Sequence, residues 1–560
     1  MKKKFLYTFV LLAAVFSCSD DFTKISPIGA LSDEALQNAQ GVDLKLTGAY
    51  ARLGGTGGWT SSGDNWWFDA ISDDAHKGST DGDQANLFDI EMMTWTTANG
   101  YFLGKWQGLY AGVNRANAVI DLISQVEGAD FTNQLAQARF LRGHFNFELQ
   151  RIFGNPAYIS EENYAATEFN QPNPGPIWDK IEADFQFAID NLPASQDSPG
   201  RPTSWAAKAY MGKVALYQGK HDAAFGFFKD VIDNGPYALI AEYGDNFRLA
   251  GDNSSETIFS IQFAADKGQS FNGNLGGTLN FPGGGPFNSC CGFYQPTQDL
   301  ANTFQTDASG LPLLDTYNQA DIANDAGIDS DQPFTPHAGN LDPRIDFTVG
   351  RRGIDYNGWG TMVGKDWIRA AHSDISGPYL PKKNVYYAGE DGNRGTGSWG
   401  QQRSGINYHI IRYADVLLMG AEAATEKSSP DLAAALDYVN QVRNRAKSST
   451  YVLNEAGDAP AANYVIEPYA SFADAAFARK AIRFERRLEL GMEGHRFFDL
   501  RRWGNAGAVL DAYIVNEARA LSQANFPAKY KGYKSHYDLM PIPLDAIDLS
   551  GNILNQNTGY

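Results

Sequence analysis

Two cysteines stand next to each other at positions 290 and 291, in a stretch rich in glycine, proline and aromatic residues. Adjacent thiols can form a disulfide in an oxidising compartment. Neighbouring Cα atoms lie about 3.8 Å apart across a trans peptide, which is less than the usual disulfide separation of about 4.4–6.8 Å. Such a bond is strained, and strained geometry tends to occur at functional sites. The sequence favours a disulfide between Cys290 and Cys291, and two free, partly buried thiols are the alternative.

Aromatic side chains among polar loop residues point to carbohydrate binding. Sugars present ring faces of polarised C–H bonds and rims of hydroxyls, so a binder needs flat aromatic surfaces beside Asp, Asn, Gln or Arg. Residues 57–67 and 280–294 have that composition. The predicted ligand contacts in these two stretches are Asp64, Asn65, Trp66, Trp67, Cys290, Cys291, Phe293 and Tyr294. The alternative for Trp66 and Trp67 is that they begin a core helix and that one of them is buried.

Further aromatic candidates lie outside these two stretches. Trp359, the Trp367-Ile368-Arg369 segment and Trp399 belong to the same loop-rich region, and Trp95 could serve either the core or a site. We therefore add Trp95, Trp359, Arg369 and Trp399 to the predicted ligand contacts. Four other tryptophans sit on predicted helices or in the motif segments described below and are assigned to packing: Trp106, Trp178, Trp205 and Trp503.

Sequence patterns for metal or covalent chemistry are missing. The eight histidines are scattered, without an HExxH motif or Cys/His pairing, so no zinc site is indicated. No GxSxG motif or phosphate-binding glycine loop occurs. Asp73-Asp74 could hold Ca²⁺ or a sugar hydroxyl, although helix capping or solvent exposure is the simpler interpretation. We expect no metal, no cofactor and no catalytic residue, and acids are too common for a glycosidase pair to be chosen.

The N-terminal residues have the pattern of an exported protein. Three lysines at 2–4 precede an apolar run from Phe5 to Phe16 that ends at Ser17-Cys18. A cationic start and a short apolar run are typical of a secretory signal rather than a membrane span. The cysteine resembles that of a bacterial lipobox, whose thiol is acylated, and the following Ser19-Asp20-Asp21 resembles the surface-export signal of Bacteroidetes lipoproteins. We predict a signal peptide at 1–17 and an acylated tether at 18–40; an ordinary signal with a coincidental cysteine is the alternative.

The charge of the chain excludes one class of partner. Removing residues 1–17 removes three lysines and no acid, so the formal net charge falls from −19 to −22. So acidic a protein repels nucleic-acid phosphates, and no run of basic residues offers a local exception. Anionic lipid would not attract it either, so membrane attachment must come from acyl chains on Cys18. No later segment is long and apolar enough to be a second span.

Helical periodicity dominates two parts of the chain. We predict a mainly α fold: a single domain at 41–560, with tetratricopeptide-like helical repeats at about 106–234 and 412–503. A loop-rich insertion at about 235–411 separates them and carries short strands at Glu256–Phe263 and Ile345–Val349. The predicted helices are Trp106–Val126, Gln134–Phe153, Ile177–Leu192, Trp205–Gln218 with Ser204 as N-cap, His221–Asp233, Arg412–Lys427, Leu432–Lys447 and Ala473–Glu493.

These helical segments resemble the SusD/RagB family of Bacteroidetes nutrient-uptake lipoproteins. The resemblance covers nearly the whole mature chain, and its strongest parts are RYADVLLMGAEA (412–423), VRNRA (442–446), IRFERRLELGMEGHRFFDLRRW (482–503) and the terminus from 540 to 560. Segments 137–156, 200–224 and 341–349 match as well. We interpret the charged residues of the third motif as structural rather than ligand contacts: Arg483, Arg486, Glu489, Arg496 and Asp499.

The resemblance implies a function and a partner. It implies a tetratricopeptide-like scaffold with a loop-rich ligand face, lipid-anchored at the cell surface of the outer membrane. It also implies a SusC-like, TonB-dependent outer-membrane barrel to which captured ligand is delivered. We expect a non-enzymatic glycan-binding protein. A peptide-binding, RagB-like member of the family and a glycoside hydrolase on a helical scaffold are the alternatives.

Overall fold

The computed structural model describes residues 33–266, 269–287, 290–370, 375–383, 385–390, 393–397, 402–523 and 525–560. The predictions for the signal peptide, for Cys18 and for Trp399 lie outside the described residues. None of the described helices is both long enough and apolar enough to cross a membrane.

Helices make up most of the regular structure, as predicted from periodicity, so the mainly α fold class is confirmed. The α-helices are α2 (Asp33–Leu36), α3 (Ala39–Tyr50), α4 (Ala85–Glu91), α5 (Gly100–Gln125), α6 (Thr132–Phe153), α7 (Glu161–Ala165), α8 (Trp178–Asn191), α9 (Ser204–Tyr217), α10 (His221–Asn234), α11 (Gln298–Thr303), α12 (Ile345–Thr348), α13 (Tyr413–Glu426), α14 (Leu432–Ser448), α15 (Ala475–Leu490), α16 (Arg496–Arg502), α17 (Ala506–Ala520), α18 (Phe526–Lys529) and α19 (Leu544–Leu549). The strands are β1 (Ala75–Gly78), β2 (Thr257–Ile261), β3 (Ala264–Asp266), β4 (Gln269–Asn272), β5 (Phe293–Pro296), β6 (Val349–Gly350), β7 (Leu380–Pro381), β8 (Arg394–Thr396), β9 (Gln402–Ser404) and β10 (Tyr408–Arg412).

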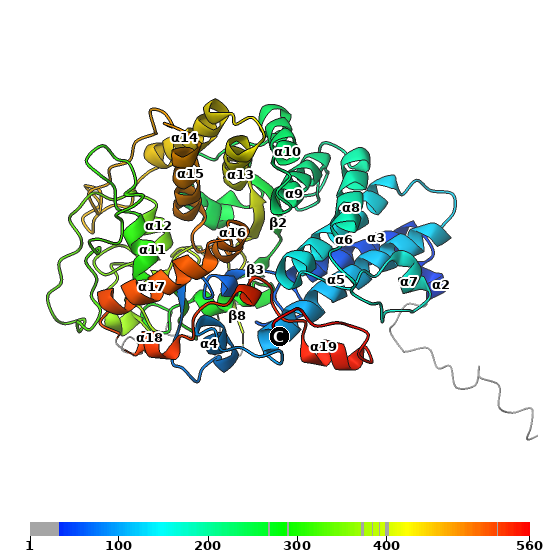
Figure 1. Cartoon of the computed structure of the whole chain (residues 1–560), viewed down its shortest axis with the longest axis horizontal. Helices are drawn as coiled ribbons and strands as arrows, with labels where there is room; N and C mark the ends of the chain where they lie inside the picture. The colour runs from blue at the N-terminus through cyan, green and yellow to red at the C-terminus, as the bar shows by residue number, and fades with distance from the viewer. Residues whose placement is uncertain are drawn as a thin grey trace, which may run out of the picture.

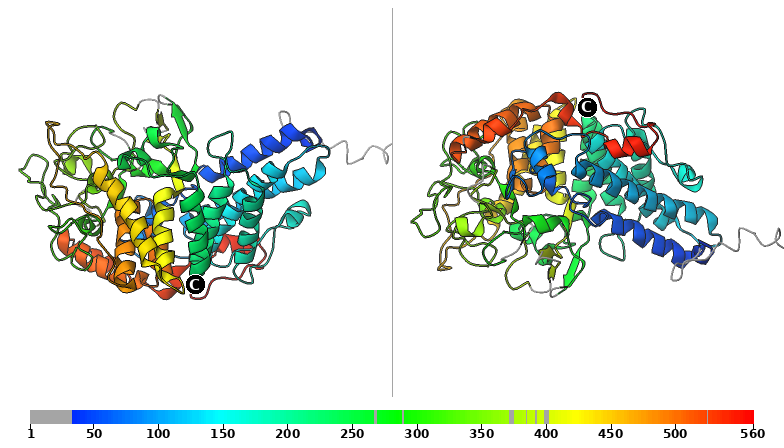
Figure 2. Two further views of the ribbon diagram at one scale, coloured as in Figure 1. Left: turned by 90° about the horizontal axis from the view of Figure 1, so that it is seen from above. Right: turned by 90° about the horizontal axis from the view of Figure 1, so that it is seen from below.

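The long helices form a row in which each packs on the next. The row runs from α5 through α6, α8, α9 and α10 to α13, and α14 and α15 pack on α13. In Figure 1 it crosses the molecule from the cyan helices to the yellow and brown ones, and both views of Figure 2 show the green loops gathered beside the far end. The helical row therefore provides a rigid support, and the loops lie against it.

The predicted helices are present, with two corrections at their starts. Helix α5 begins at Gly100 rather than Trp106, because the Asn99 side chain accepts a hydrogen bond from the Tyr101 N–H and so caps an earlier turn. Helix α9 is capped by Thr203, whose hydroxyl accepts from the Ala206 N–H, and not by Ser204. Both corrections concern which of several suitable residues caps the helix.

Close packing of α9 and α10 explains the small residues predicted at this helix pair. A Cβ atom placed on Gly212 would lie only 2.7–3.0 Å from the ring of Phe228. Both Phe228 and the alanines of α9, such as Ala206 and Ala209, are fully buried. The two helices can thus approach only because one presents almost no side chain where the other presents a ring.

The insertion leaves the helical row and returns to it at one place. Strand β2 follows α10, strand β10 directly precedes α13, and the two pair antiparallel with Tyr408 opposite Ile261 and Arg412 opposite Thr257. In the described part of the chain the strands form five separate two-stranded sheets. Most of the insertion is therefore loop, held at its two ends by β2 and β10.

One predicted strand is a helix. Residues Ile345–Thr348 form α12, and only Val349–Gly350 is a strand. The Asp342 carboxylate accepts a hydrogen bond from the Arg344 N–H, and the Asp342 carbonyl accepts from the Ile345 N–H. This local turn starts a helix in spite of the β-branched residues, whose strand preference is weak and dependent on context.

The charged residues of the 482–503 motif are largely buried in ion pairs, as expected for a structural role. Arg486 pairs with Asp415 and Asp499, with 2.8 Å between charged atoms in each case. Glu489 pairs with three arginines, and Arg496 pairs with Asp73. Arg483 differs from them, since it is half-buried and lies over the ring of Trp503.

The Asp73-Asp74 pair neither caps a helix nor faces solvent. Arg487 forms ion pairs with both carboxylates, and all three side chains are buried. Among the described residues, no group of three or more His, Cys, Asp or Glu side chains is arranged to hold a metal ion.

Candidate functional site

A small second core organises the loops of the insertion. Phe281, Phe287, Tyr356 and Tyr386 are buried in it together with five aliphatic side chains, and the half-buried Trp359 packs against it. The Phe287 and Trp359 rings lie 4.9 Å apart, and the Trp359 indole N–H donates to the Tyr386 carbonyl at 3.1 Å. This core fixes the orientation of Trp359 while leaving part of its ring exposed.

The cysteine pair lies at the end of a loop that closes on itself. The Phe281 carbonyl accepts hydrogen bonds from the N–H groups of both Cys291 and Gly292. The structure joins Cys290 and Cys291 in a disulfide, with Cys291 fully buried and Cys290 half-buried. Only the Cys290 side of the pair is therefore available to a ligand.

Glycines in this loop allow it to lie flat against residues 366–369. A Cβ atom on Gly283 would be 2.5 Å from the Arg369 Cβ, and one on Gly284 would be 2.5 Å from the Asp366 carbonyl oxygen. Gly285 has a φ of +67°, and a Cβ there would lie 2.6 Å from the Trp367 ring. The loop sequence Gly283-Gly284-Gly285 is thus required for the contact with Trp367 and Arg369.

Arg369 links the cysteine loop to the N-terminal part of the chain. Its guanidinium donates to the Cys291 carbonyl at 2.9 Å and forms an ion pair with Asp83 at 2.7 Å. The Arg369 and Asp83 side chains are 37% and 31% exposed, so both retain polar atoms at the surface. We call Cys290, Trp359, Trp367, Arg369 and Asp83 the loop cluster. Its half-exposed rings can stack on a sugar, and its charged pair can bind hydroxyls.

The first predicted stretch does not form an exposed platform. Trp66 and Trp67 are 4% and 1% exposed and belong to a short 3₁₀ helix in the main core. Trp67 stacks on Phe68 at 3.7 Å, and Trp66 meets the Tyr408 ring edge-on at 5.1 Å. The prediction of ligand contact is wrong for both tryptophans, because the rings fill the space between the N-terminal segment and the helices.

Asp64 and Asn65 are buried beside them and serve the same core. The Lys105 ammonium donates to the carbonyls of Ser62, Gly63 and Asp64, which holds this loop in place. Burial raises the pKa of the Asp64 carboxyl to about 6, although Lys105 opposes the shift. Neither side chain reaches the surface, so both predictions of ligand contact are corrected.

Phe293 and Tyr294 are corrected for the same reason. They lie in β5, which pairs with β1, and they are 1% and 3% exposed. The Lys77 ammonium lies 5.0 Å from the centre of the Phe293 ring and donates to three backbone carbonyls of the turn after β1. Both rings are thus covered by other parts of the protein, and neither is available to a ligand.

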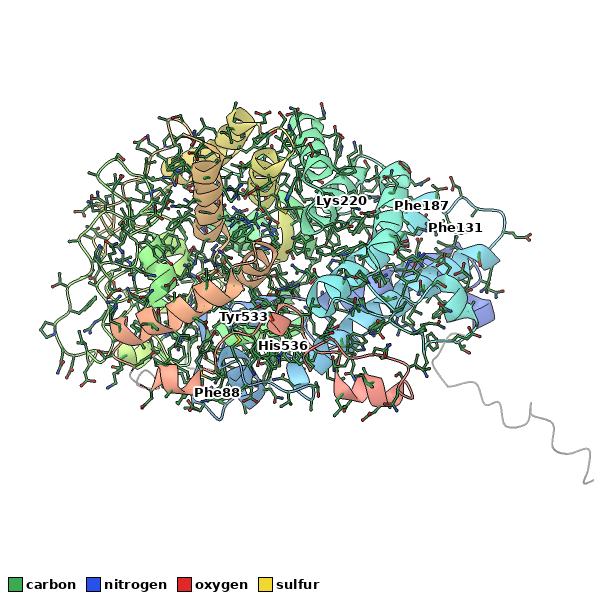
Figure 3. All side chains as sticks on the ribbon, viewed as in Figure 1. Phe88, Phe131, Phe187, Lys220, Tyr533 and His536 are labelled. Atoms are coloured by element: carbon green, nitrogen blue, oxygen red, sulfur yellow. A yellow bond between two sulfur atoms is a disulfide. The ribbon has the colours of Figure 1, made fainter. Side chains whose placement is uncertain are left out.

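Trp95 serves the core rather than a site. Its indole N–H donates to the Tyr560 hydroxyl at 3.2 Å, and its ring lies 4.2 Å from that of Tyr537. Tyr533 and His536, labelled in Figure 3, flank Tyr537 at 6.0 and 4.4 Å. These aromatic contacts attach the C-terminal segment to the body of the protein.

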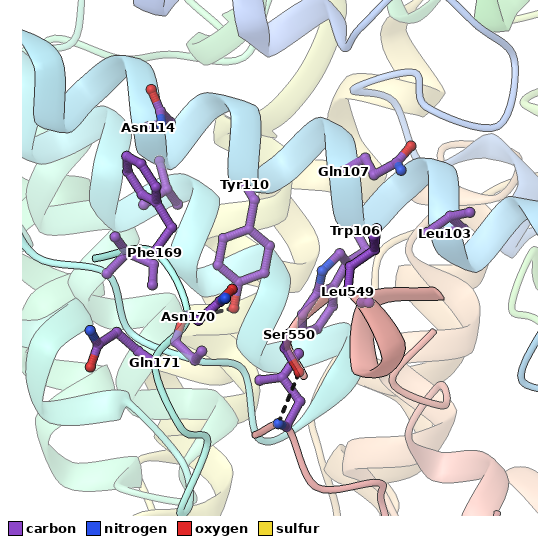
Figure 4. Close-up of a pocket in the computed structure, with 15 residues that line it drawn as sticks. Leu103, Trp106, Gln107, Tyr110, Asn114, Phe169, Asn170, Gln171, Leu549 and Ser550 are labelled. Atoms are coloured by element: carbon purple, nitrogen blue, oxygen red, sulfur yellow. Dashed lines mark hydrogen bonds between the residues drawn. The ribbon is translucent and has the colours of Figure 1, made fainter. Parts of the chain in front are cut away.

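A separate hollow of about 290 Å³ lies between α5, the loop at 169–171 and α19. Figure 4 shows Trp106 and Tyr110 of α5 along its wall, with Leu549 near Trp106 and Asn170 near Tyr110. Trp106 is 7% exposed, and its ring lies 4.7 Å from that of Tyr110. The α5–α19 pocket thus combines rings with amides, which is also a composition suited to a sugar.

Sequence reasoning identified part of the loop cluster and missed the rest. Arg369 bonds to the cysteine loop, and Trp359 packs on Phe287 of the same loop, whereas Asp83 was not predicted. Asp83 lies in an ordinary acidic turn, and only the pairing of β1 with β5 brings that turn next to the insertion. The sequence around Asp83 therefore gives no indication that this residue belongs to the loop cluster.

Two family models match the chain. The model described as the SusD family matches residues 255–560, which is more than half of the chain. The model described as "Starch-binding associating with outer membrane" matches residues 37–216.

Individual relatives agree with these models. The chain is 25% identical to the SusD-like protein P2 of Formosa agariphila, with all of both chains covered. It is 27% identical to a SusD-like protein of Bacteroides ovatus, over 71% of this chain and 65% of that one.

Solved structures share the fold. A SusD homolog from Bacteroides thetaiotaomicron superposes with a TM-score of 0.69 at 22% identity, covering 95% of this chain and 99% of that one. The surface glycan-binding protein A of the same species, in complex with laminarihexaose, superposes with a TM-score of 0.63 at 20% identity, covering 93% and 99%. A laminarin-binding SusD-like protein gives 0.65 at 22% identity, covering 93% and 100%. The chain belongs to the SusD family.

Proposed function

We propose that this protein is a non-catalytic glycan-binding lipoprotein of the outer membrane surface, which delivers captured glycan to a SusC-like, TonB-dependent transporter. The observation that carries the proposal is the loop cluster, where half-buried Trp359 and Trp367 pack on the small second core and Trp367 is followed by Arg369, which pairs with Asp83. Family membership supports a glycan as the class of ligand, because proteins of the same fold include a laminarin-binding SusD-like protein and a surface glycan-binding protein in complex with laminarihexaose.

The chemistry of the loop cluster suits reversible binding. Fixed rings supply flat surfaces, and the ion pair supplies both donors and acceptors for hydroxyls. A pair of stacked aromatic rings contributes about 0.5–1.5 kcal/mol beyond the area it buries, and we expect a sugar ring stacked on an indole to contribute on the same order. Replacing either Trp359 or Trp367 by alanine should therefore weaken glycan binding several-fold without unfolding the main core.

Calorimetry with a panel of neutral polysaccharides, laminarin and starch among them, tests this assignment. Trp359→Ala and Trp367→Ala are compared with Phe169→Ala, which removes a 44% exposed ring at the α5–α19 pocket. Loss of affinity in the two tryptophan variants alone is expected. If glycan affinity falls only in Phe169→Ala, the glycan binds in the α5–α19 pocket, and its assignment to the loop cluster is refuted.

The same samples separate the two rival functions. A glycoside hydrolase would release reducing ends from the polysaccharide that it binds, and we expect none. A peptide-binding protein would show heat of binding with a mixture of peptides and none with any glycan. Either result would overturn the proposed function.

Delivery to a transporter is tested in the bacterium that encodes the chain. A tagged copy purified from detergent-solubilised outer membranes should carry a TonB-dependent barrel with it. Cys18→Ser should release the protein from the membrane fraction, because the acyl chains are the proposed anchor. Retention of the Cys18→Ser variant in that fraction would contradict lipid anchoring, and absence of a barrel would contradict delivery.

A further inference from the structure

A pocket lined by cations lies on α15, away from the loop cluster. Its volume is about 340 Å³, near the lower end of the range of about 300–1,000 Å³ for small-ligand sites. Five of its eleven lining residues are basic and none is acidic, although the whole chain carries a formal net charge of −19. The lining residues of this α15 pocket are Tyr317, Ala476, Arg479, Lys480, Arg483, Phe484, Arg487, Arg496, Leu500, Trp503 and Asn505.

Four of the five cations have acidic partners outside the pocket. Arg487 and Arg496 are buried and pair with core aspartates. Arg479 pairs with Glu426, and Lys480 pairs with Asp315 at 2.7 Å, both near the surface. The acidic partners of these four cations therefore lie outside the pocket, behind or beside its wall.

Arg483 is the exception. Among the side chains that the structure describes, none forms an ion pair with it, and its Nε is buried without a hydrogen-bond acceptor. Glu422 and Glu426 are close enough to act on it electrostatically, but they pair with Arg502 and Arg479. Burial lowers the pKa of the Arg483 guanidinium, and the positive charge of Arg502 lowers it further. A polar group without a partner in such surroundings is costly, so an external partner would stabilise it.

The spacing of the cations on α15 concentrates this charge. Arg479, Arg483 and Arg487 follow one another at intervals of four residues, so they lie on the same face of the helix. Like charges at this spacing destabilise a helix. An oxyanion in the pocket would remove that repulsion and would accept hydrogen bonds from Arg483.

We propose that the α15 pocket binds the carboxylate or sulfate group of an acidic saccharide. The oxyanion would lie against Arg483, with Arg479 and Lys480 at the mouth. Tyr317 and Phe484, whose rings meet edge-on at 5.5 Å, and Trp503 form the remaining wall. Such rings contribute nothing to a bare anion, but they suit the apolar face of a sugar ring that carries the charge.

This inference does not rest on the proposed function of the loop cluster. A neutral glycan has no group that needs Arg483, and an acidic saccharide in the α15 pocket does not touch Trp359. The two sites can therefore be tested separately in one set of variants.

The experiment is calorimetry at low ionic strength with four probes: trigalacturonic acid, a disaccharide carrying one sulfate ester, sodium sulfate and neutral laminaritriose. The variants are Arg483→Gln, Lys480→Gln and a matched control, Arg115→Gln, which removes an exposed arginine of α5. Lys480 is 49% exposed, so its replacement tests the pocket even if Arg483→Gln fails to fold.

The acidic saccharides are expected to bind the unaltered protein, more weakly as salt is added. Arg483→Gln should lower their affinity about ten- to one-hundred-fold, the range of a hydrogen bond to a charged group. Lys480→Gln should lower it several-fold, and Arg115→Gln should leave it unchanged. Sodium sulfate binding as tightly as the saccharides would overturn the saccharide assignment. No binding of either acidic saccharide, or an equal loss in the Arg115 variant, would overturn the site.

Discussion

Glu489 is the residue at which the structural interpretation of the 482–503 motif can be tested most directly. Its side chain is fully buried, and its carboxylate forms ion pairs with Arg344 at 3.0 Å, with Arg412 at 2.6 Å and with Arg445. Burial alone would raise the pKa of Glu489, but Arg445, Arg412 and Arg344 hold it well below its usual range. The carboxylate therefore stays charged inside the protein.

The magnitude of the effect follows from what Glu489→Ala leaves behind. Removing one member of a buried ion pair costs about 3–5 kcal/mol when the other charge is left uncompensated. Here each of the three guanidinium groups keeps at least one further carboxylate partner. We therefore expect the free energy of unfolding to fall by about 3 kcal/mol, at the lower end of that range.

Denaturant unfolding at pH 7, followed by circular dichroism, measures this loss. The control is Glu467→Ala, which breaks an ion pair with Lys447 whose side chains are 48% and 43% exposed. It should change the free energy of unfolding by less than about 1 kcal/mol. Folded Glu489→Ala should bind glycan normally. Equal stability of the two variants, or lost glycan affinity at unchanged stability, would refute the structural interpretation of the motif.

Three further predictions concern packing, pH and the cysteine pair. Gly212→Val should lower the unfolding midpoint in denaturant by forcing an isopropyl group against the Phe228 ring, whereas Gly226→Ala, at an open position of α10, should not. Burial alone would lower the pKa of His76, but its ring N–H groups donate hydrogen bonds to two buried glutamates, which raise the pKa to about 9. Stability should therefore fall as the pH rises from 6.5 through 9, and His76→Gln should flatten that slope. Replacing Cys290 and Cys291 together by serine should weaken glycan affinity in calorimetry while the protein stays folded, and unchanged affinity would remove the disulfide from the loop cluster.

Helices were predictable here because the information for them is local. The period of the apolar residues defines α6 and α13 within a few residues. Gly154 directly follows α6, and Pro430 lies four residues after the end of α13. The segment 345–348 was not predictable in this way, since the helical turn depends on the Asp342 side chain and not on apolar period. Local pattern thus defines long helices well and short connecting elements poorly.

The candidate site was only partly predictable, because composition cannot distinguish a buried ring from an exposed one. Trp66 and Trp359 stand in similar polar, glycine-containing sequence, yet Trp66 is 4% exposed and Trp359 is half-buried at the surface. The two rings differ in exposure because different parts of the fold cover them. Tyr408, from the strand that returns the insertion to the helices, lies against Trp66, whereas Trp359 rests on the small second core and has one side open.

The α15 pocket shows that composition is also a poor guide to the charge of a surface site. A formal net charge of −19 and the lack of a basic run both predict a surface that repels anions. Folding separates the charges, because Asp73, Asp74 and Asp299 are drawn into the core by Arg487, while Arg483 is left facing the pocket. Buried ion pairs therefore remove acids from the surface more completely than the sequence suggests. An acidic protein can in this way offer a strongly cationic site, and the response of acidic saccharide binding to Arg483→Gln decides whether this one is used.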